Sequence, residues 1–548
     1  MEKPRQGMVA GLSFYQERFE KIVMTMKRVF VTGFLLILTI SFARAGKGTD
    51  TVEFKKHLFY QELNRLGNIR SAGTNPVGLS YNQIGRVTDA SVGVGFGRGS
   101  FHAIDHADKR NDFSVKIDGL QRFGKLSLSG SFTYLNAKDY ARRWNSTLYL
   151  TSTNPFLFCD SVPSDVSTEQ FSLSAAAAYV LTKRVAAGLE VSYLTGSAAD
   201  QTDPRPKTNA MRLYLKPGVE WKISQSHALG LAVQFGLFRS DMTNTIINTQ
   251  ESHTYFLMKG MGDYFVRTTN DLSSYPRDYK GSSWQAAMQW VVQPTGGMVA
   301  NFLEISYSAL KEDAVDGGSA YTFRGGDYRK KQLDLRERLD FGNEEKVRQH
   351  VVLQATYAMD EGFWYDQRRM VDTEHANLVY YEILAKSKVR ESNYLDAGLD
   401  YQVDFLKDGM PDAMLKAGAV LQHARIKQYE MELFEQKYTL AHVVLEGNKR
   451  WWVGSCCFQA SLAGAYRFGI GETAFAAVRE DISAVYTAPA FAWQTADVAK
   501  VRGRVEFDVP LSFYGYRTGM GIFADVTGLW GEGGATRTFT NIGLNVRL

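Results

Sequence analysis

The sequence predicts an all-β protein, a transmembrane antiparallel β-barrel with about 18 strands, within a range of about 14 to 18. Three observations favour this class: polar and apolar residues alternate with a period of two, short and long connections alternate, and one short apolar run lies near the start. Residues 87–548 are assigned to the barrel. Residues 46–86 are assigned to a short N-terminal helical or plug segment.

The alternation is clearest in the last residues of the sequence. One face of an extended chain would carry Ile542, Leu544, Val546 and Leu548, whereas the other would carry Asn541, Gly543, Asn545 and Arg547. A strand with one apolar and one polar face suits a wall between lipid and water. We expect this strand to close the barrel by pairing with the first strand, residues 87–97.

The connections between alternating stretches have two lengths. Tight turns are expected at 121–124, 181–183, 224–227, 293–297, 342–346, 406–412 and 446–450. Long links are expected at 137–168, 240–280, 360–391 and 468–495. This order is typical of outer-membrane barrels, which have short periplasmic turns and longer extracellular loops.

Residues 1–45 are interpreted as a leader with a secretory signal. Lys27 and Arg28 precede an apolar run over residues 29–40, and Ala43-Arg44-Ala45 forms an A-x-A cleavage site. The run is shorter than the roughly 20 residues of a spanning helix. Translation is expected to start at Met24 or Met26. Export through a cleaved signal, together with the barrel pattern, predicts the cell outer membrane of a Gram-negative bacterium.

Composition excludes several classes of protein. Residues 1–45 hold seven Lys or Arg and three Asp or Glu, which leaves 56 basic and 55 acidic residues and a net charge of +1. This balance gives no electrostatic reason to expect a nucleic-acid partner. A mean hydropathy of −0.25 excludes a bundle of membrane helices. Three cysteines, Cys159, Cys456 and Cys457, do not suggest a disulfide framework.

The expected lumen face is charged. Candidate lumen-lining residues lie on two strands: Lys330, Asp334, Arg336 and Arg338 on one, and Arg212, Lys216 and Glu220 on the other. Two interpretations stay open for these residues. They could form a solvated, ion-paired interior, or a selectivity ring for an anionic solute.

The segment before the first strand carries helix and turn signals. Phe54, Leu58, Phe59 and Leu63 recur at helical spacing, and Gly67 is placed to end the helix. A turn-rich stretch then supplies the candidate plug residues Asn75, Pro76, Gly78 and Leu79. Gly93, Gly95 and Gly97 share one face of the first strand. We hypothesise that they make room for the plug segment.

No catalytic, cofactor or metal site is assigned, and the chain is not expected to be an enzyme. His102 and His106 lie with Asp105 and Asp108 in the first long-side link, where a solvated polar loop is favoured over a rim Asp/His pair or a weak metal site. His423 and His442 fall on opposite faces, which argues against a dyad. Aromatic residues near strand ends, including Trp221, Trp290, Trp452 and Trp530, suit the lipid headgroup level. Loop aromatics such as Trp144 and Trp364 leave a carbohydrate platform open.

Two resemblances add to this reading. The stretch Asn75-Pro-Val-Gly-Leu79 is similar to the Asn-Pro-Ala-Gly-Leu element of long-chain fatty-acid-transporter-like barrels. Nearly the whole mature chain resembles an uncharacterised family of Gram-negative outer-membrane barrels, a domain of unknown function. The residues that carry this second resemblance are Asn75–Tyr81 with Gly85, Trp144-Asn145, Pro155-Phe156, Asp160 and Asp203-Pro-Arg-Pro-Lys207. The family implies a fold, and neither a substrate nor catalytic residues.

Three functions are kept in order. The leading hypothesis is a channel or transporter for a small solute, a hydrophobic one by analogy with the fatty-acid transporters. The second is a cell-surface binding or adhesion protein whose long loops act while the barrel is an anchor. The third is an outer-membrane hydrolase. Expected partners are outer-membrane lipid and lipopolysaccharide, the barrel-assembly machinery and an unknown small solute.

Overall fold

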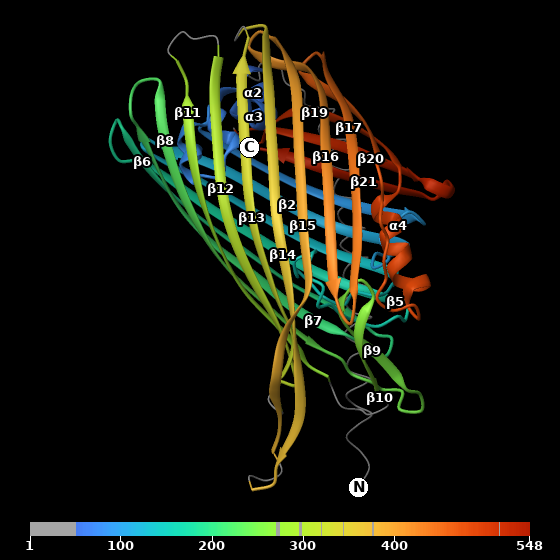
Figure 1. The fold of residues 1–548 in the computed structure, drawn as a ribbon. Coiled ribbons are helices and arrows are strands. Elements are labelled where there is room, and N and C mark those ends of the chain that lie inside the picture. Colours follow the sequence, from blue (N-terminus) through green and yellow to red (C-terminus); the bar gives the residue numbers. More distant parts are fainter. Residues whose placement is uncertain are drawn as a thin grey trace, which may run out of the picture.

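The computed structural model describes residues 51–269, 275–294, 299–318, 321–342, 345–374, 378–513 and 516–548. The predicted leader, residues 1–45, lies outside the described residues. Eighteen strands form one closed antiparallel sheet, and three more form a small separate sheet (Figure 1). Among the described residues, none of the helices has the length and apolar character needed to cross a bilayer.

The barrel strands follow one another around the wall in sequence order. They are β1 (Arg86–Gly99), β2 (Lys109–Phe123), β3 (Leu126–Arg142), β5 (Ser164–Val180), β6 (Val185–Asp200), β7 (Lys207–Lys222), β8 (His227–Thr243), β11 (Arg277–Val292), β12 (Val299–Asp316), β13 (Phe323–Phe341), β14 (Val347–Asp372), β15 (Leu378–Lys407), β16 (Met410–Tyr429), β17 (Leu433–Val453), β18 (Cys456–Gly469), β19 (Val498–Phe513), β20 (Tyr516–Gly531) and β21 (Thr536–Arg547).

The remaining elements lie before the barrel or in its connections. They are the helices α2 (Thr51–Leu58), α3 (Tyr60–Gly67), η1 (Ile69–Ala72), η2 (Pro76–Tyr81), η3 (Ser483–Thr487), α4 (Ala488–Thr495) and η4 (Glu532–Gly534), and the strands β4 (Phe158–Cys159), β9 (His253–Gly260) and β10 (Asp263–Thr269).

The predicted closure is confirmed. β21 pairs antiparallel with β1, with Gly543 opposite Gly93 and Arg547 opposite Asp89. Thr88 and Leu548 exchange two backbone hydrogen bonds of 2.8 Å each. The ladder therefore leaves no free sheet edge, as a hydrocarbon environment requires. The predicted count of about 18 strands is confirmed as well.

Alternation sorts the side chains as the sequence predicts. Apolar side chains such as Leu215, Leu237 and Leu333 are 43%, 56% and 49% exposed on the outer surface. Their sequence neighbours turn inward and carry the polar contacts described below. An apolar outer face around a polar interior identifies an outer-membrane type of barrel.

Two predicted connections are wrong. Residues 360–391 were expected to form a long link, but they form the end of β14, the start of β15 and the turn between them. This hairpin projects beyond the barrel (Figure 1), so its strands need no apolar lipid face, and the polar sequence hid them. A turn was expected at 446–450, but β17 continues through it because Glu446, Asn448 and Arg450 face the polar interior. The turn lies at Gly454, where φ is +61°.

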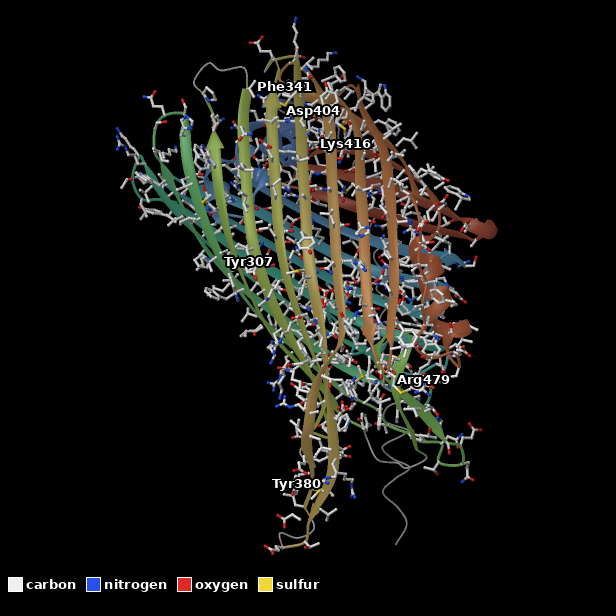
Figure 2. The ribbon with its side chains drawn as sticks, viewed as in Figure 1. Tyr307, Phe341, Tyr380, Asp404, Lys416 and Arg479 are labelled. Atoms are coloured by element: carbon white, nitrogen blue, oxygen red, sulfur yellow. The ribbon has the colours of Figure 1, made fainter. Side chains whose placement is uncertain are left out.

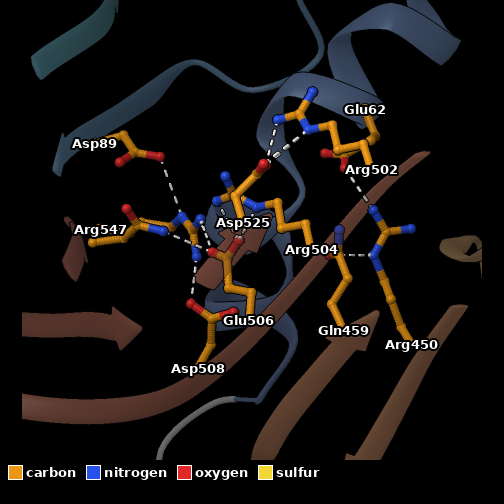
Figure 3. A network of polar contacts seen from close by, with 11 residues as sticks. Glu62, Asp89, Arg450, Gln459, Arg502, Arg504, Glu506, Asp508, Asp525 and Arg547 are labelled. Atoms are coloured by element: carbon orange, nitrogen blue, oxygen red, sulfur yellow. Dashed lines mark hydrogen bonds and ion pairs between the residues drawn. The ribbon is translucent and has the colours of Figure 1, made fainter. Parts of the chain in front are cut away.

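An ion network lies where the two ends of the barrel sequence meet. Arg547 contacts three carboxylates, Asp89 at 3.2 Å, Glu506 at 2.6 Å and Asp508 at 2.5 Å (Figure 3). Asn545 also donates to Glu506 at 2.7 Å. All these groups are largely withdrawn from water, so each charge depends on the others for its solvation.

We predict that Arg547→Met destabilises the barrel by roughly 3–5 kcal/mol, because buried carboxylates lose their common partner. The measurement is the temperature at which the fast-migrating folded band disappears in detergent gel electrophoresis. Arg368→Met is the control, because its ion pair with Glu382 is exposed and worth about 0–1 kcal/mol. Equal melting of the two variants would contradict the role of Arg547.

Candidate functional site

The N-terminal residues 51–85, hereafter the plug segment, lie inside the barrel. Its helices contact strands all round the wall: η2 contacts β3, β5, β6 and β7, η1 contacts β12 and β13, α3 contacts β16, and α2 contacts β20. Only an element within the lumen can reach all of these strands. Figure 1 shows α2 and α3 at the end where the turns are short, opposite the projecting β14–β15 hairpin.

The helical part of the plug segment has an apolar contact with the wall. Phe54 and Phe59 meet the Trp452 ring edge-on, with centroids 6.3 and 6.1 Å apart. Phe54, Leu58 and Phe59 also bury Cys457 completely. Trp452 therefore faces inward, and its predicted place in the lipid headgroup belt is wrong, whereas Trp221, Trp290 and Trp530 are about half exposed on the outside.

The turn after the helices rests on a row of wall glycines. The Asn75 side chain accepts from the Val77 amide at 3.0 Å and donates to the carbonyls of Val219 and Leu231 at 3.1 and 3.2 Å. Gly188 and Gly218 face each other on β6 and β7. A Cβ at Gly188 would lie 2.9 Å from the Val77 nitrogen, and one at Gly218 would meet the Asn75 side chain. Only glycine permits this approach.

The glycine hypothesis was therefore correct in kind and wrong in position. The space around Gly93, Gly95 and Gly97 is taken by side chains of the neighbouring strands β2 and β21, including Asp112, Asn541 and Phe539. The wall glycines beside the plug segment are on β6, β7 and β8 instead. Their signal in the sequence is weak, because each strand contributes a single glycine rather than an alternating run.

A buried ion pair connects the plug segment to β7. Arg70 Nε donates to Glu220 at 2.6 Å, and the two side chains are 8% and 2% exposed. The Tyr81 hydroxyl donates to the other Glu220 oxygen at 2.5 Å, and its ring lies 3.9 Å from the Arg70 guanidinium carbon. Burial raises the pKa of Tyr81, which keeps the hydroxyl protonated as a donor to this carboxylate.

A second polar group lies across the lumen near β13–β15. Arg65 pairs with Asp404 at 2.8 Å, and His350 lies 3.1 Å from Asp404 and 2.7 Å from Asp340. Arg338 pairs with Asp340 at 2.6 Å and donates to the Arg65 carbonyl at 2.9 Å. Asp404 is labelled at this end of the barrel in Figure 2. A pocket of about 650 Å³ lies between this group and the adjoining turns.

The candidate lumen-lining residues have three kinds of partner. Glu220, Arg336 and Arg338 contact the plug segment, Arg336 through the Ala72 carbonyl at 2.9 Å. Arg212 binds the outer loops, with bonds to the Tyr149 carbonyl and to Glu312. The other three stay on the wall: Lys330 lies opposite Asp360, Asp334 accepts from Thr356, and Lys216 pairs with Glu190.

The candidate plug residues gather at one place. Asn75 and Pro76 lie against the wall glycines, the Gly78 carbonyl accepts from Asn68 at 2.8 Å, and Leu79 is half-buried. Sequence reasoning did not identify Arg65, Arg70 or Tyr81 as plug contacts. Nothing in the pattern distinguishes them, because their partners lie 139 to 339 residues away.

Two long loops fold into the opposite end of the barrel. β4 pairs with β9, which joins the 143–163 loop to the 244–276 loop in the small sheet. Their apolar side chains pack on the inner wall in a cluster, hereafter the loop cluster, that includes Phe156, Phe158, Tyr279, Tyr328 and Trp364. Arg277 and Asp316 pair beside it at 2.5 Å with no exposure.

Packing in these loops bears on the carbohydrate alternative. Trp144 and Trp364 are 3% and 9% exposed, so neither offers a ring face to a surface glycan. Burial raises the pKa of Asp160, which accepts from the Val162 amide in the same loop, to about 6. These residues serve the internal packing of the loops.

The histidines lie in ordinary polar contacts. His102 Nε2 is 2.7 Å from Asp108, and Asp105 instead accepts from Asn145. His423 contacts Thr439, whereas His442 contacts Gln422 on the other face of the wall. Within the described part of the chain, no three or more His, Cys, Asp or Glu side chains are grouped as a metal site would require.

A family model matches residues 76–548, which hold the whole barrel and η2, and its description is Family of unknown function (DUF6850). The chain belongs to this family. The match confirms the resemblance to an uncharacterised family. No curated protein matches the chain.

Several solved structures are similar in fold alone. A FadL homologue of Pseudomonas aeruginosa is 12% identical over 88% of this chain and 97% of that chain, with a TM-score of 0.32. The Pseudomonas putida toluene transporter TodX is 8% identical over 87% and 93%, with a TM-score of 0.29. The Yersinia pestis ferric yersiniabactin uptake receptor FyuA is 9% identical over 85% and 81%, with a TM-score of 0.37.

We predict that Glu220→Ala loosens the plug segment, because the Arg70 guanidinium then stays buried without its carboxylate. Hydrogen exchange of the backbone amides of residues 68–81 should become at least about tenfold faster, since about 1.4 kcal/mol of lost protection corresponds to that factor. Glu190→Ala, on the neighbouring strand and 31% exposed, is the control. Unchanged exchange in the Glu220 variant would show that this ion pair does not hold the plug segment.

Proposed function

We propose that this barrel passes a small solute across the outer membrane and that the plug segment controls the passage. The observation that carries the proposal is the kind of contact that holds the plug segment. The barrel ladder closes through β1 and β21 without it. The plug segment is therefore not needed to complete the wall, yet it fills the lumen at the short-turn end.

Three ion pairs join the plug segment to three separate parts of the wall. Glu62 pairs with Arg450 on β17 at 2.6 Å (Figure 3), Arg65 with Asp404 on β15, and Arg70 with Glu220 on β7. Charged groups that separate in a wet lumen regain solvation from water, whereas a wall of apolar contacts would offer no such exchange. These contacts support a segment that can leave its seat while the barrel stays closed.

The interior also bears on the solute. Ion pairs and polar side chains line the wall from the plug segment to the loop cluster, so a wholly apolar molecule would find no continuous apolar path. We infer a polar or amphipathic solute. We also propose that the chain is exported, folded into the outer membrane by the barrel-assembly machinery, and surrounded by outer-membrane lipid and lipopolysaccharide.

Removal of the plug segment tests this function. In planar bilayers, the chain lacking residues 51–85 should conduct ions at a level well above the full-length protein, because the short-turn end is then open. A chain lacking the hairpin residues 366–384 is the control and should conduct like the full-length protein. Equal low conductance of all three proteins, with the barrels folded, would overturn the proposal.

One observation favours surface binding as a second function. The β14–β15 hairpin projects beyond the barrel with Tyr380 near its tip (Figure 2), and Leu378, Ile383 and Leu384 are 56%, 49% and 57% exposed. Apolar side chains outside the membrane are typical of a contact surface. Deletion of residues 366–384 should then abolish binding of the bacterium to its target surface, and full binding without the hairpin would dismiss this function.

A further inference from the structure

A pocket of about 270 Å³ lies inside the barrel on the side that the loop cluster leaves open. Its walls are the first extracellular link, the α4 region and the inner faces of β17–β21. Six side chains give it its character: the rings of Phe101, Trp493 and Phe539, and the cations of Arg467, Lys500 and Arg537. No carboxylate lines it.

The three cations lack an ion-pair partner within the described residues. Arg467 donates to the carbonyls of Ala496 and Trp493 at 3.0 and 2.9 Å. Arg537 donates to those of Gly99 and Ala107 at 3.3 and 2.8 Å. These carbonyls fix the guanidinium groups without neutralising them. Lys500 is exposed toward the pocket.

This charge excess is local. Elsewhere in the interior, arginines have carboxylate partners, such as Arg212 with Glu312 at 2.8 Å and Arg277 with Asp316 at 2.5 Å. Two aspartates near the pocket have other partners. Asp108 binds His102, and Asp497 accepts from the Gly469 amide at 3.0 Å. An anion entering the pocket would therefore meet uncompensated positive charge.

The apolar part of the pocket is mainly aromatic. Phe539 is 38% exposed, and the Arg537 guanidinium carbon lies 5.0 Å from the centre of its ring. Phe101 and Trp493 supply two further rings from the link and from α4. Flat aromatic surfaces beside guanidinium groups favour a planar ring that carries a negative charge. The volume is small and suits one ring rather than a long chain.

A route leads to this pocket from outside. A second pocket of about 600 Å³ lies between the first extracellular link and α4, and it shares Phe101, His102 and Trp493 with the inner one. These three side chains therefore form the partition between an outer and an inner chamber. A molecule from the cell exterior would pass them before it reached the cations.

We propose that the inner pocket is a binding site for small aromatic carboxylates, which are a class of solute for this barrel. The site rests on the proposed function for its role in passage. Arg467, Lys500 and Arg537 attract and hold the carboxylate, and Phe101, Trp493 and Phe539 contact the ring.

Calorimetric titration of the purified full-length protein with benzoate tests the site. Benzoate should bind, and benzyl alcohol, which keeps the ring without the charge, should bind at least about tenfold more weakly. Lys500→Gln should weaken benzoate binding by about tenfold, because it removes the cation that has no other partner. Phe539→Leu should weaken benzoate more than acetate.

Lys416→Gln is the matched control. Lys416 is an interior lysine on β16 that pairs with Asp400 at 3.1 Å, outside the pocket (Figure 2), and its loss should leave benzoate affinity unchanged. Equal binding of benzoate and benzyl alcohol, no binding at about 1 mM benzoate, or equal effects of the two lysine variants would each overturn the site.

The outcome is distinguishable from failure of the proposed function. Titration needs no passage, so benzoate binding in a barrel that stays closed without its plug segment would retain the site and remove the transport role. An opened barrel that conducts ions but binds no benzoate would retain transport and remove the site.

Discussion

The closed hydrogen-bond ladder is the constraint on which the rest of this structure depends. In hydrocarbon, an unpaired strand edge has no water to satisfy it, so β1 must meet β21. That junction brings Asp89 beside Arg547, although 458 residues separate them in the sequence. Once the wall is complete, every inward side chain faces an enclosed space. The polar half of the alternating pattern then becomes the lining of a lumen.

What fills this lumen differs between its two ends. At the short-turn end, the plug segment combines one apolar contact, around Trp452 and Cys457, with ion pairs to several strands. At the other end, the loop cluster is a dry aromatic core that rests on β8 and β11–β15. The side formed by β17–β21 has no such core, and the two connected pockets lie there. This asymmetry places the most open part of the lumen beside its unpaired cations.

The sequence predicted the wall well and the contents of the lumen poorly. Alternation and turn spacing depend on local physics, so the closure, the strand count and the inward direction of Arg338 and Glu220 could be read from short stretches. The Arg70–Glu220 pair, the glycines under Asn75 and the inner pocket depend on register between distant strands. Local patterns misled where polarity had another cause, as in the β14–β15 hairpin outside the membrane and in β17, whose Gly447 and Asn448 looked like a turn.

Cys457 offers the most direct test of the central claim, that a displaceable plug segment closes the lumen. Its side chain is fully buried beneath Phe54, Leu58 and Phe59. In a Cys159→Ser, Cys456→Ser background, a water-soluble maleimide should not label Cys457 in the intact protein, but should label it when residues 51–67 are removed. Rapid labelling of the intact protein, or none after the removal, would contradict the account.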